Sequence, residues 1–196
     1  MQTTLTEVPE RQSYRFSRDE FYQMHDFGMF DNQRVELIAG EIVTMAPMKN
    51  YHFAANDNVR AALEAIFGAG FWVRMQGSLD LSPHSVVMPD VTVIVGSRTA
   101  PLPDNPTTAL LIVEVSDSTL RTDRRTKGSL YAASGIQDYW ILNLVDRELE
   151  IHRDPVSDTT AEFGFRYSSE TVLGPGDVAS PLAMPNRQVA VNDLLP

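Results

Sequence analysis

Two acidic residues stand beside or within segments that are otherwise apolar. Glu114 interrupts the run Leu-Leu-Ile-Val-Glu-Val at 110–115, and Asp90 opens the apolar residues 91–95. A charge in a strand covered on both faces costs several kcal/mol unless it is paired, neutralised or bound to metal. If the two strands are neighbours, the carboxylates converge and offer the oxygen ligands that Mg²⁺ prefers. The alternative is that Asp90 caps a turn and Glu114 pairs with an arginine.

A basic residue follows the Glu114 strand. Lys127 is one of two lysines in the chain, the other being Lys49. Asp123 and Lys127 are four residues apart, so they share one face of a helix, and Tyr131 extends that face. Lys127 is then either a surface partner of Asp123 or a cation that points back over the strand ends. In the second case it could orient a water molecule and stabilise a phosphate transition state.

The composition limits the class of protein. The chain has 196 residues, no cysteine, 43% hydrophobic residues and a net charge of −10. The missing cysteine excludes disulfides, thiolate-bound zinc and a thiol nucleophile, and the acidity argues against passive nucleic-acid binding. The first residues lack the layout of a secretory signal, and no apolar run approaches the ~20 residues of a membrane span. We therefore expect a cytoplasmic protein.

Capping, turn and periodicity signals predict the first half of the fold. Ser17 and Glu20 form a capping box, so a helix should follow with Phe21, Met24, Phe27 and Met29 or Phe30 buried. Segments 35–38 and 42–45 flank Ala-Gly and predict a hairpin. Residues 50–67 predict a helix that buries Phe53, Val59, Leu63 and Ile66 or Phe67 before two glycines.

The second half predicts mostly strands. We expect them at 71–75, 79–81, 91–95, 109–115 and 139–144, with a proline-rich loop at 101–108 and a helix at 122–134. Polar and apolar residues alternate over segment 148–153, which predicts a strand with one solvent-exposed face that carries His152. Weaker strands are expected near 163–167 and 188–191. Because a helix connects strands 109–115 and 139–144, the two should be parallel.

This order predicts a mixed α/β or α+β fold, with a central mixed β-sheet flanked by helices and an N-terminal helix and β-hairpin. We expect a flexible arm over residues 1–16 and a single domain over 17–196. The core of that domain should span about 34–155, and the C-terminal strands 156–196. Trp72 and Trp140 are interpreted as core residues.

An ordered set of motifs resembles the Uma-type putative restriction endonucleases, a branch of the PD-(D/E)xK nuclease superfamily. The set consists of Val-Glu-Leu-Ile-Ala-Gly-Glu-Ile-Val at 35–43, Pro-Asp-Val at 89–91, Ile-Val-Glu-Val-Ser at 112–116, Asp123, Lys127, Tyr131, Gly135 and Tyr-Trp-Ile at 139–141. The resemblance covers about residues 17–155. It implies a restriction-endonuclease-like core and metal-dependent phosphodiester hydrolysis.

The resemblance also implies roles for particular residues. Asp90 and Glu114 match the two metal-binding acids, with Mg²⁺ as the expected ion and Mn²⁺ as a substitute. Ser116 stands where the parent motif has lysine, which points to Lys127 on the following helix as the catalytic lysine. Glu36 matches an additional catalytic acid, and Glu41 is its rival. If residues 35–38 form a strand, Glu36 and Ile38 share one face.

Two functions follow from these features. The first is a Mg²⁺-dependent deoxyribonuclease that cleaves DNA as a homodimer, because a two-strand cut needs two sites. The second is a catalytically inactive binding or regulatory module on the same fold, since fold does not fix function. The net charge and Ser116 favour the second function. His52, Gln76, Asp80 and His84 are weaker site candidates, for which packed or surface roles are expected.

Overall fold

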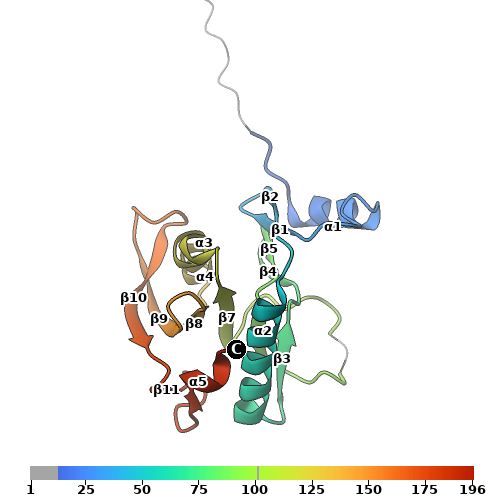
Figure 1. Cartoon of the computed structure of the whole chain (residues 1–196). Coiled ribbons are helices and arrows are strands. Elements are labelled where there is room, and N and C mark those ends of the chain that lie inside the picture. Colours follow the sequence, from blue (N-terminus) through green and yellow to red (C-terminus); the bar gives the residue numbers. More distant parts are fainter. Residues whose placement is uncertain (1–12, 101) are drawn as a thin grey trace, which may run out of the picture.

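A six-stranded mixed sheet forms the centre of the fold. The structure is a computed structural model that describes residues 13–100 and 102–196 (Figure 1). The strand order is β10-β9-β8-β7-β6-β3, and β7 and β8 are the parallel pair. The elements are α1 Arg18–Asp26, β1 Val35–Ile38, β2 Glu41–Thr44, α2 Asn50–Phe67, β3 Phe71–Met75, β4 Leu79–Ser82, β5 Ser85–Val87, β6 Val91–Val95, β7 Leu111–Ser116, α3 Leu120–Thr122, π-helix η1 Asp123–Lys127, α4 Gly128–Ala133, β8 Asp138–Asn143, β9 Glu148–Ser157, β10 Phe165–Leu173, β11 Val178–Ala179, β12 Val189–Ala190 and α5 Val191–Leu194.

The two faces of this sheet are covered by different helices. On one face, Val59 and Leu63 of α2 pack with Val113 and Trp140. On the other, Leu130 and Tyr131 of α4 pack with strand residues such as Ile112. Neighbouring residues in a strand point to opposite faces. Glu114, which is two residues from Ile112, therefore faces the side that carries α3, η1 and α4.

A second, smaller sheet holds the hairpin. Its strand order is β2-β1-β5-β4, all antiparallel. The hairpin turn needs Ala39 and Gly40 at positive φ (49° and 80°). A Cβ at Gly40 would lie 2.7 Å from the Arg15 Cβ, so only glycine allows this approach. Phe16 N donates to Gly40 O, which places residues 13–16 along the hairpin, while residues 1–12 of the expected arm lie outside the described residues.

Most of the expected elements are present. The capping box of Ser17 and Glu20 is formed, and α2 spans the predicted residues. The mixed α/β class, the hairpin and the parallel pairing of the 109–115 and 139–144 segments are confirmed. Trp140 is fully buried, whereas Trp72 is only half-buried under the guanidinium of Arg74.

Several details were predicted wrongly. Phe27 is exposed because α1 ends at Asp26 and Gly28 turns the chain with a positive φ. Of the two alternatives Met29 and Phe30, Phe30 packs against the core and Met29 is exposed. Phe53 is also exposed, since the buried stripe of α2 begins two residues later at Ala55. Strand β5 was not expected.

The helix after β7 and strand β9 also differ from the expectation. The helix expected at 122–134 begins at Leu120 and contains a π-turn. Strand β9 has no wet face over Leu149–His152, because β10 and the helix after β7 cover it; His152 is buried.

Candidate active site

The four residues that the sequence singles out come from β1, β7, η1 and the residue before β6, and they lie close together. Lys127 Nζ, at the end of η1, lies 2.9 Å from Glu114 Oε1 of β7 and 3.5 Å from Glu36 Oε1 of β1. Asp90, one residue before β6, donates its backbone N–H to Glu114 Oε2 over 3.3 Å. All four side chains are buried. The structure therefore places two carboxylates, those of Glu36 and Glu114, around one ammonium, with Asp90 joined to Glu114 through its backbone N–H.

The Asp90 carboxylate is held by three neighbouring groups. Its Oδ2 accepts the Val115 backbone N–H at 3.0 Å and lies 3.1 Å from His52 Nε2, while its Oδ1 accepts Asn56 Nδ2 at 3.1 Å. Burial alone would raise the pKa of Asp90. The contacts with His52 and the Val115 amide outweigh that effect, so the pKa lies below its usual value. Asp90 is thus a fixed, ionised carboxylate.

Glu114 sits in a different electrostatic environment. Its Oε1 accepts both Lys127 Nζ and the Tyr131 hydroxyl, the latter at 2.6 Å. Burial raises the pKa of Glu114, Lys127 opposes the rise, and the charge of Asp90 adds to it. The net shift is upward, as expected for one carboxylate among several. A further cation near Glu114 would therefore favour its ionised form.

Glu36 and Glu41 are separated by the geometry. Glu36 points into the cluster, where its Oε1 accepts the Met88 backbone N–H at 2.7 Å. Glu41 lies at the surface on the neighbouring strand β2 and pairs with Arg15 at 2.6 Å. Only Glu36 is in reach of Lys127.

The lysine reaches the cluster from a helix turn with unusual hydrogen bonding. Residues Asp123–Lys127 form a π-turn in which Gly128 N–H donates to Asp123 O. The same carbonyl accepts the Tyr139 hydroxyl at 3.0 Å. Single π-turns inside helices are frequent at functional sites. Burial lowers the pKa of Lys127, but the charges of Glu114 and Glu36 outweigh it and hold that pKa above its ordinary value.

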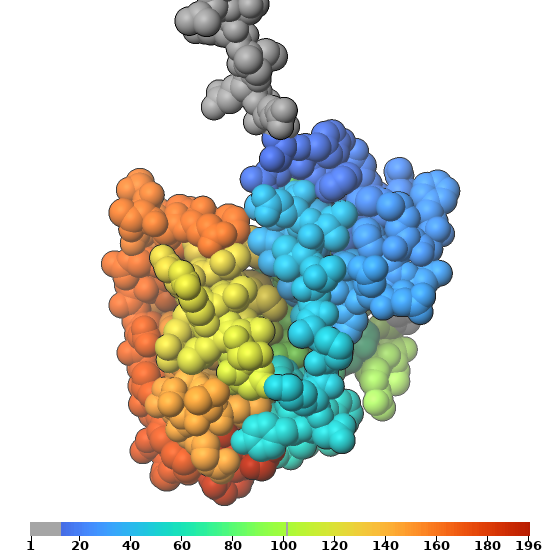
Figure 2. Space-filling view, turned by 45° about the horizontal axis from the view of Figure 1, so that its top comes forward, coloured from blue at the N-terminus to red at the C-terminus, as the bar shows by residue number. Residues whose placement is uncertain are grey.

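A cavity of about 360 Å³ opens onto the cluster. Its lining includes Glu36, Asp90, Glu114 and Lys127 together with the segment 43–49 and residues 117–119. Figure 2 shows the hollow between the cyan segment near residue 50 and the yellow segment near residue 120. Asp123 also lines the cavity and accepts the Thr119 hydroxyl at 2.6 Å. The acidic cluster is thus accessible from outside.

The weaker candidates lie outside the cluster, with one exception. Asp80 accepts the Tyr22 hydroxyl at 2.6 Å, and His84 contacts Phe16 O on the surface. Gln76 contacts Asp90 only through its backbone, Gln76 N donating to Asp90 O at 3.1 Å. His52 is the exception, because it lines the cavity and touches Asp90.

Sequence reasoning undervalued His52 and missed Asn56. Both lie on α2 and both contact Asp90, one at each carboxylate oxygen. Their spacing of four residues places them on one helix face. A polar pair on the helix that packs beside the Asp90 strand was therefore a usable signal.

The residues present fit a hard divalent cation. Asn56 Oδ1 is fully buried and, within the described residues, has no hydrogen-bond donor. Glu36 and Glu114 share one lysine, and Asp90 and Asp123 line the same cavity, so the cluster carries excess negative charge in a buried place. Carboxylate and carbonyl oxygens are the ligands that Mg²⁺ prefers. Asp90 and Glu114 could hold such an ion, and His52 and Asn56 contact Asp90.

A family profile matches almost the whole chain. The profile described as "Uma2: Putative restriction endonuclease" matches residues 18–192. The chain belongs to the Uma2 family. No curated protein matches the sequence.

A crystal structure described as a putative nuclease belonging to DUF820 from Anabaena variabilis ATCC 29413 has a similar fold. The TM-score is 0.66 at 14% sequence identity, with 91% of this chain and 97% of that chain covered. At this identity the similarity concerns the fold. Among the described residues of the Uma2 chain, no helix has the length and apolarity to cross a membrane.

Proposed function

We propose that this Uma2 protein is an endonuclease that hydrolyses DNA phosphodiester bonds with Mg²⁺, for which Mn²⁺ can substitute. The observation that carries the proposal is the meeting of Glu36, Asp90, Glu114 and Lys127 in one accessible cavity. Family membership supports the same reaction class.

Each residue has a role that follows from its contacts. Asp90 and Glu114 would hold the ion, which when bound supplies Lewis-acid polarisation of the phosphate and a more acidic water. His52 and Asn56 keep Asp90 oriented. Lys127 remains charged and is aimed at the carboxylates, so it can position water and stabilise negative charge on the phosphate. Glu36 fixes Lys127 and can accept a proton from the water.

The direct test is DNA cleavage by charge-neutral variants. Supercoiled plasmid and labelled oligonucleotides are incubated with Mg²⁺ or Mn²⁺ and wild-type, Asp90→Asn, Glu114→Gln or Glu36→Gln protein. We expect losses of ~10²-fold or more for Asp90→Asn and Glu114→Gln. Glu41→Gln is the matched control, because it removes a carboxylate from the same hairpin at the surface, and it should cleave like wild type. Equal cleavage by all variants would exclude the proposed centre.

The proposal includes a homodimer, because cutting both strands at one position requires two such centres. Light scattering at micromolar concentration should give twice the chain mass. A monomer that nevertheless makes double-strand cuts would refute the dimer and leave the centre in place.

An inactive binding module is the second candidate, and one contact favours it. Lys127 Nζ already pairs with Glu114 at 2.9 Å in a buried position, so the lysine can itself neutralise the acid. Calorimetry separates the two functions. A Mg²⁺ or Mn²⁺ site that Glu114→Gln abolishes supports the nuclease, and absence of any Glu114-dependent site supports the inactive module.

A further inference from the structure

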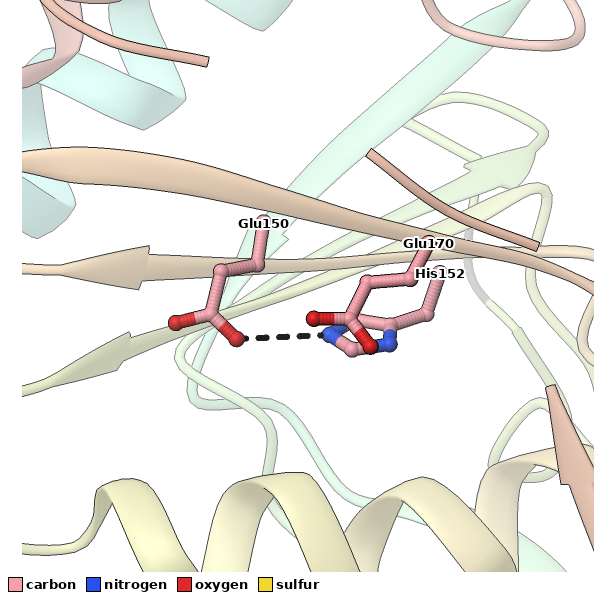
Figure 3. Close-up of side chains that lie close together, drawn as sticks. All are labelled: Glu150, His152 and Glu170. Carbon is pink, nitrogen blue, oxygen red and sulfur yellow. Dashed lines mark ion pairs between the residues drawn. The ribbon is translucent and has the colours of Figure 1, made fainter. Parts of the chain in front are cut away.

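A second cluster of possible metal ligands lies on the same sheet face, separated from the first by the helical segment α3–η1–α4. Glu150 and His152 are two apart on β9, and Glu170 of β10 pairs with His152 in the sheet register. All three side chains therefore project from one face. Figure 3 shows them converging, and one ligand atom of each lies within 4.8 Å of the others.

The histidine has an unused polar atom that points into the cluster. His152 is 8% exposed, and its Nε2 has no hydrogen-bond partner within the described residues. The nearest charged atom is Glu150 Oε2 at 3.5 Å. Two ligands of a tetrahedral zinc ion, each bonded at its usual length, are separated by about 3.4 Å. The observed separation suits two ligands of one ion.

The cluster is accessible and faces a cavity of about 700 Å³. That cavity is lined by His152 and Glu170 and by the helix residues Arg124 and Ser129. Glu170 is exposed and makes no side-chain hydrogen bond within the described residues. An incoming ion therefore has a path to the cluster, and water can complete its coordination.

One cation already competes for this position. Arg124 of η1 donates Nε to Glu150 Oε2 at 2.8 Å and Nη2 to Glu150 Oε1 at 2.7 Å. The Arg124 side chain is 43% exposed, so it can move away from Oε2 without burying a charge elsewhere. Glu150 Oε1 would keep Asn143 Nδ2 at 3.3 Å as a donor. Arg124 thus occupies the place that a metal would take.

We propose that Glu150, His152 and Glu170 form a zinc site, with Arg124 as its built-in competitor. One imidazole nitrogen and two carboxylate oxygens, with a water as the fourth ligand, are a set that Zn²⁺ accepts readily. Mg²⁺ favours all-oxygen ligands, so the two clusters differ in the ion they select. The zinc site joins β9 to β10, and its existence does not depend on nuclease activity.

Calorimetric titration with Zn²⁺ tests the proposal, with a parallel measurement of the melting temperature. We expect one site in wild-type protein that is retained in Asp90→Asn/Glu114→Gln, which separates it from the acidic centre. Glu170→Gln and His152→Asn should weaken Zn²⁺ binding at least 10-fold and abolish the zinc-dependent rise in melting temperature. Glu162→Gln removes another acid from the same cavity and should bind like wild type.

Arg124→Met provides the complementary result, because removing the competitor should tighten Zn²⁺ binding at least 10-fold. If His152→Asn fails to fold, the exposed residue Glu170 still decides the question. The proposal is overturned if wild-type protein binds no Zn²⁺, if Glu170→Gln binds it as wild type does, or if Asp90→Asn/Glu114→Gln loses the site.

Discussion

Replacing Lys127 by methionine separates its electrostatic role from packing. Methionine keeps most of the side-chain volume but removes the ammonium that lies 2.9 Å from Glu114 and 3.5 Å from Glu36. Leaving one partner of a buried ion pair unpaired costs about 3–5 kcal/mol. In the variant, Glu114 can become neutral by taking up a proton, because burial already raises its pKa. This neutralisation sets an upper limit on the cost. We therefore expect a loss of about 3 kcal/mol in urea unfolding at pH 7.

The matched control is Lys49→Met, which removes the other lysine of the chain. Lys49 also lines the cavity, but its pairing with Asp117 at 3.3 Å is exposed. Exposed pairs contribute about 0–1 kcal/mol, so this variant should unfold nearly as wild type does. The comparison tests whether burial determines the cost.

A double variant distinguishes lost stability from lost chemistry. Lys127→Met/Glu114→Gln removes both charges, so most of the lost stability should return. If the proposed reaction is correct, plasmid cleavage should fall by ~10²-fold or more in Lys127→Met and stay low in the double variant. Full cleavage by Lys127→Met, or a stability loss below about 0.5 kcal/mol, would refute the reasoning.

Three further predictions concern stability. Ser17→Ala removes the capping box of α1 and should lower the free energy of unfolding by about 1 kcal/mol in urea, whereas no loss would mean that the cap is not formed in solution. Leu63→Ala should lower the free energy of unfolding by about 2–5 kcal/mol, whereas Phe53→Ala on the exposed face of the same helix should lower it by less than about 0.5 kcal/mol. Similar losses in the two variants would show that the buried face of α2 is assigned to the wrong residues. Burial raises the pKa of four tyrosines, so the unfolded chain releases their protons near pH 10 before the folded chain does, and stability should fall as the pH rises above 10. The four residues are Tyr22, Tyr131, Tyr139 and Tyr167. Absorbance and circular dichroism should show that they ionise together with unfolding. Ionisation before unfolding would contradict their burial.

Features set by neighbours in the sequence were predictable. The capping box, the Ala-Gly turn and the end of α2 at Gly68 all depend on residues within one turn of each other. The Asp90 and Glu114 positions were also predictable, because an acid beside apolar strand residues stands out from its pattern. Their meeting required only that β6 and β7 pair, as they do.

Features set by distant packing were not predictable in the same way. The π-turn is accompanied by a hydrogen bond from the Tyr139 hydroxyl of the next strand to Asp123 O. His152 looked solvent-exposed because β9 alternates, but β10 and the helix before β8 bury it. The role of His52 and Asn56 can be recognised only when the position of α2 beside Asp90 is known.

The split of the fold into two sheets has a mechanical consequence. Glu36 belongs to the four-stranded sheet, whereas Glu114 belongs to the six-stranded sheet and Asp90 directly precedes one of its strands. Lys127 contacts Glu36 of the first sheet and Glu114 of the second. The two sheets also share one apolar cluster, in which Ile38, Leu79 and Val87 of the smaller sheet pack with residues of β7, α4 and β8. Because Lys127 contacts one carboxylate from each sheet, a substitution that displaced the hairpin would change the charge around the ammonium from a site far from β7 in the sequence.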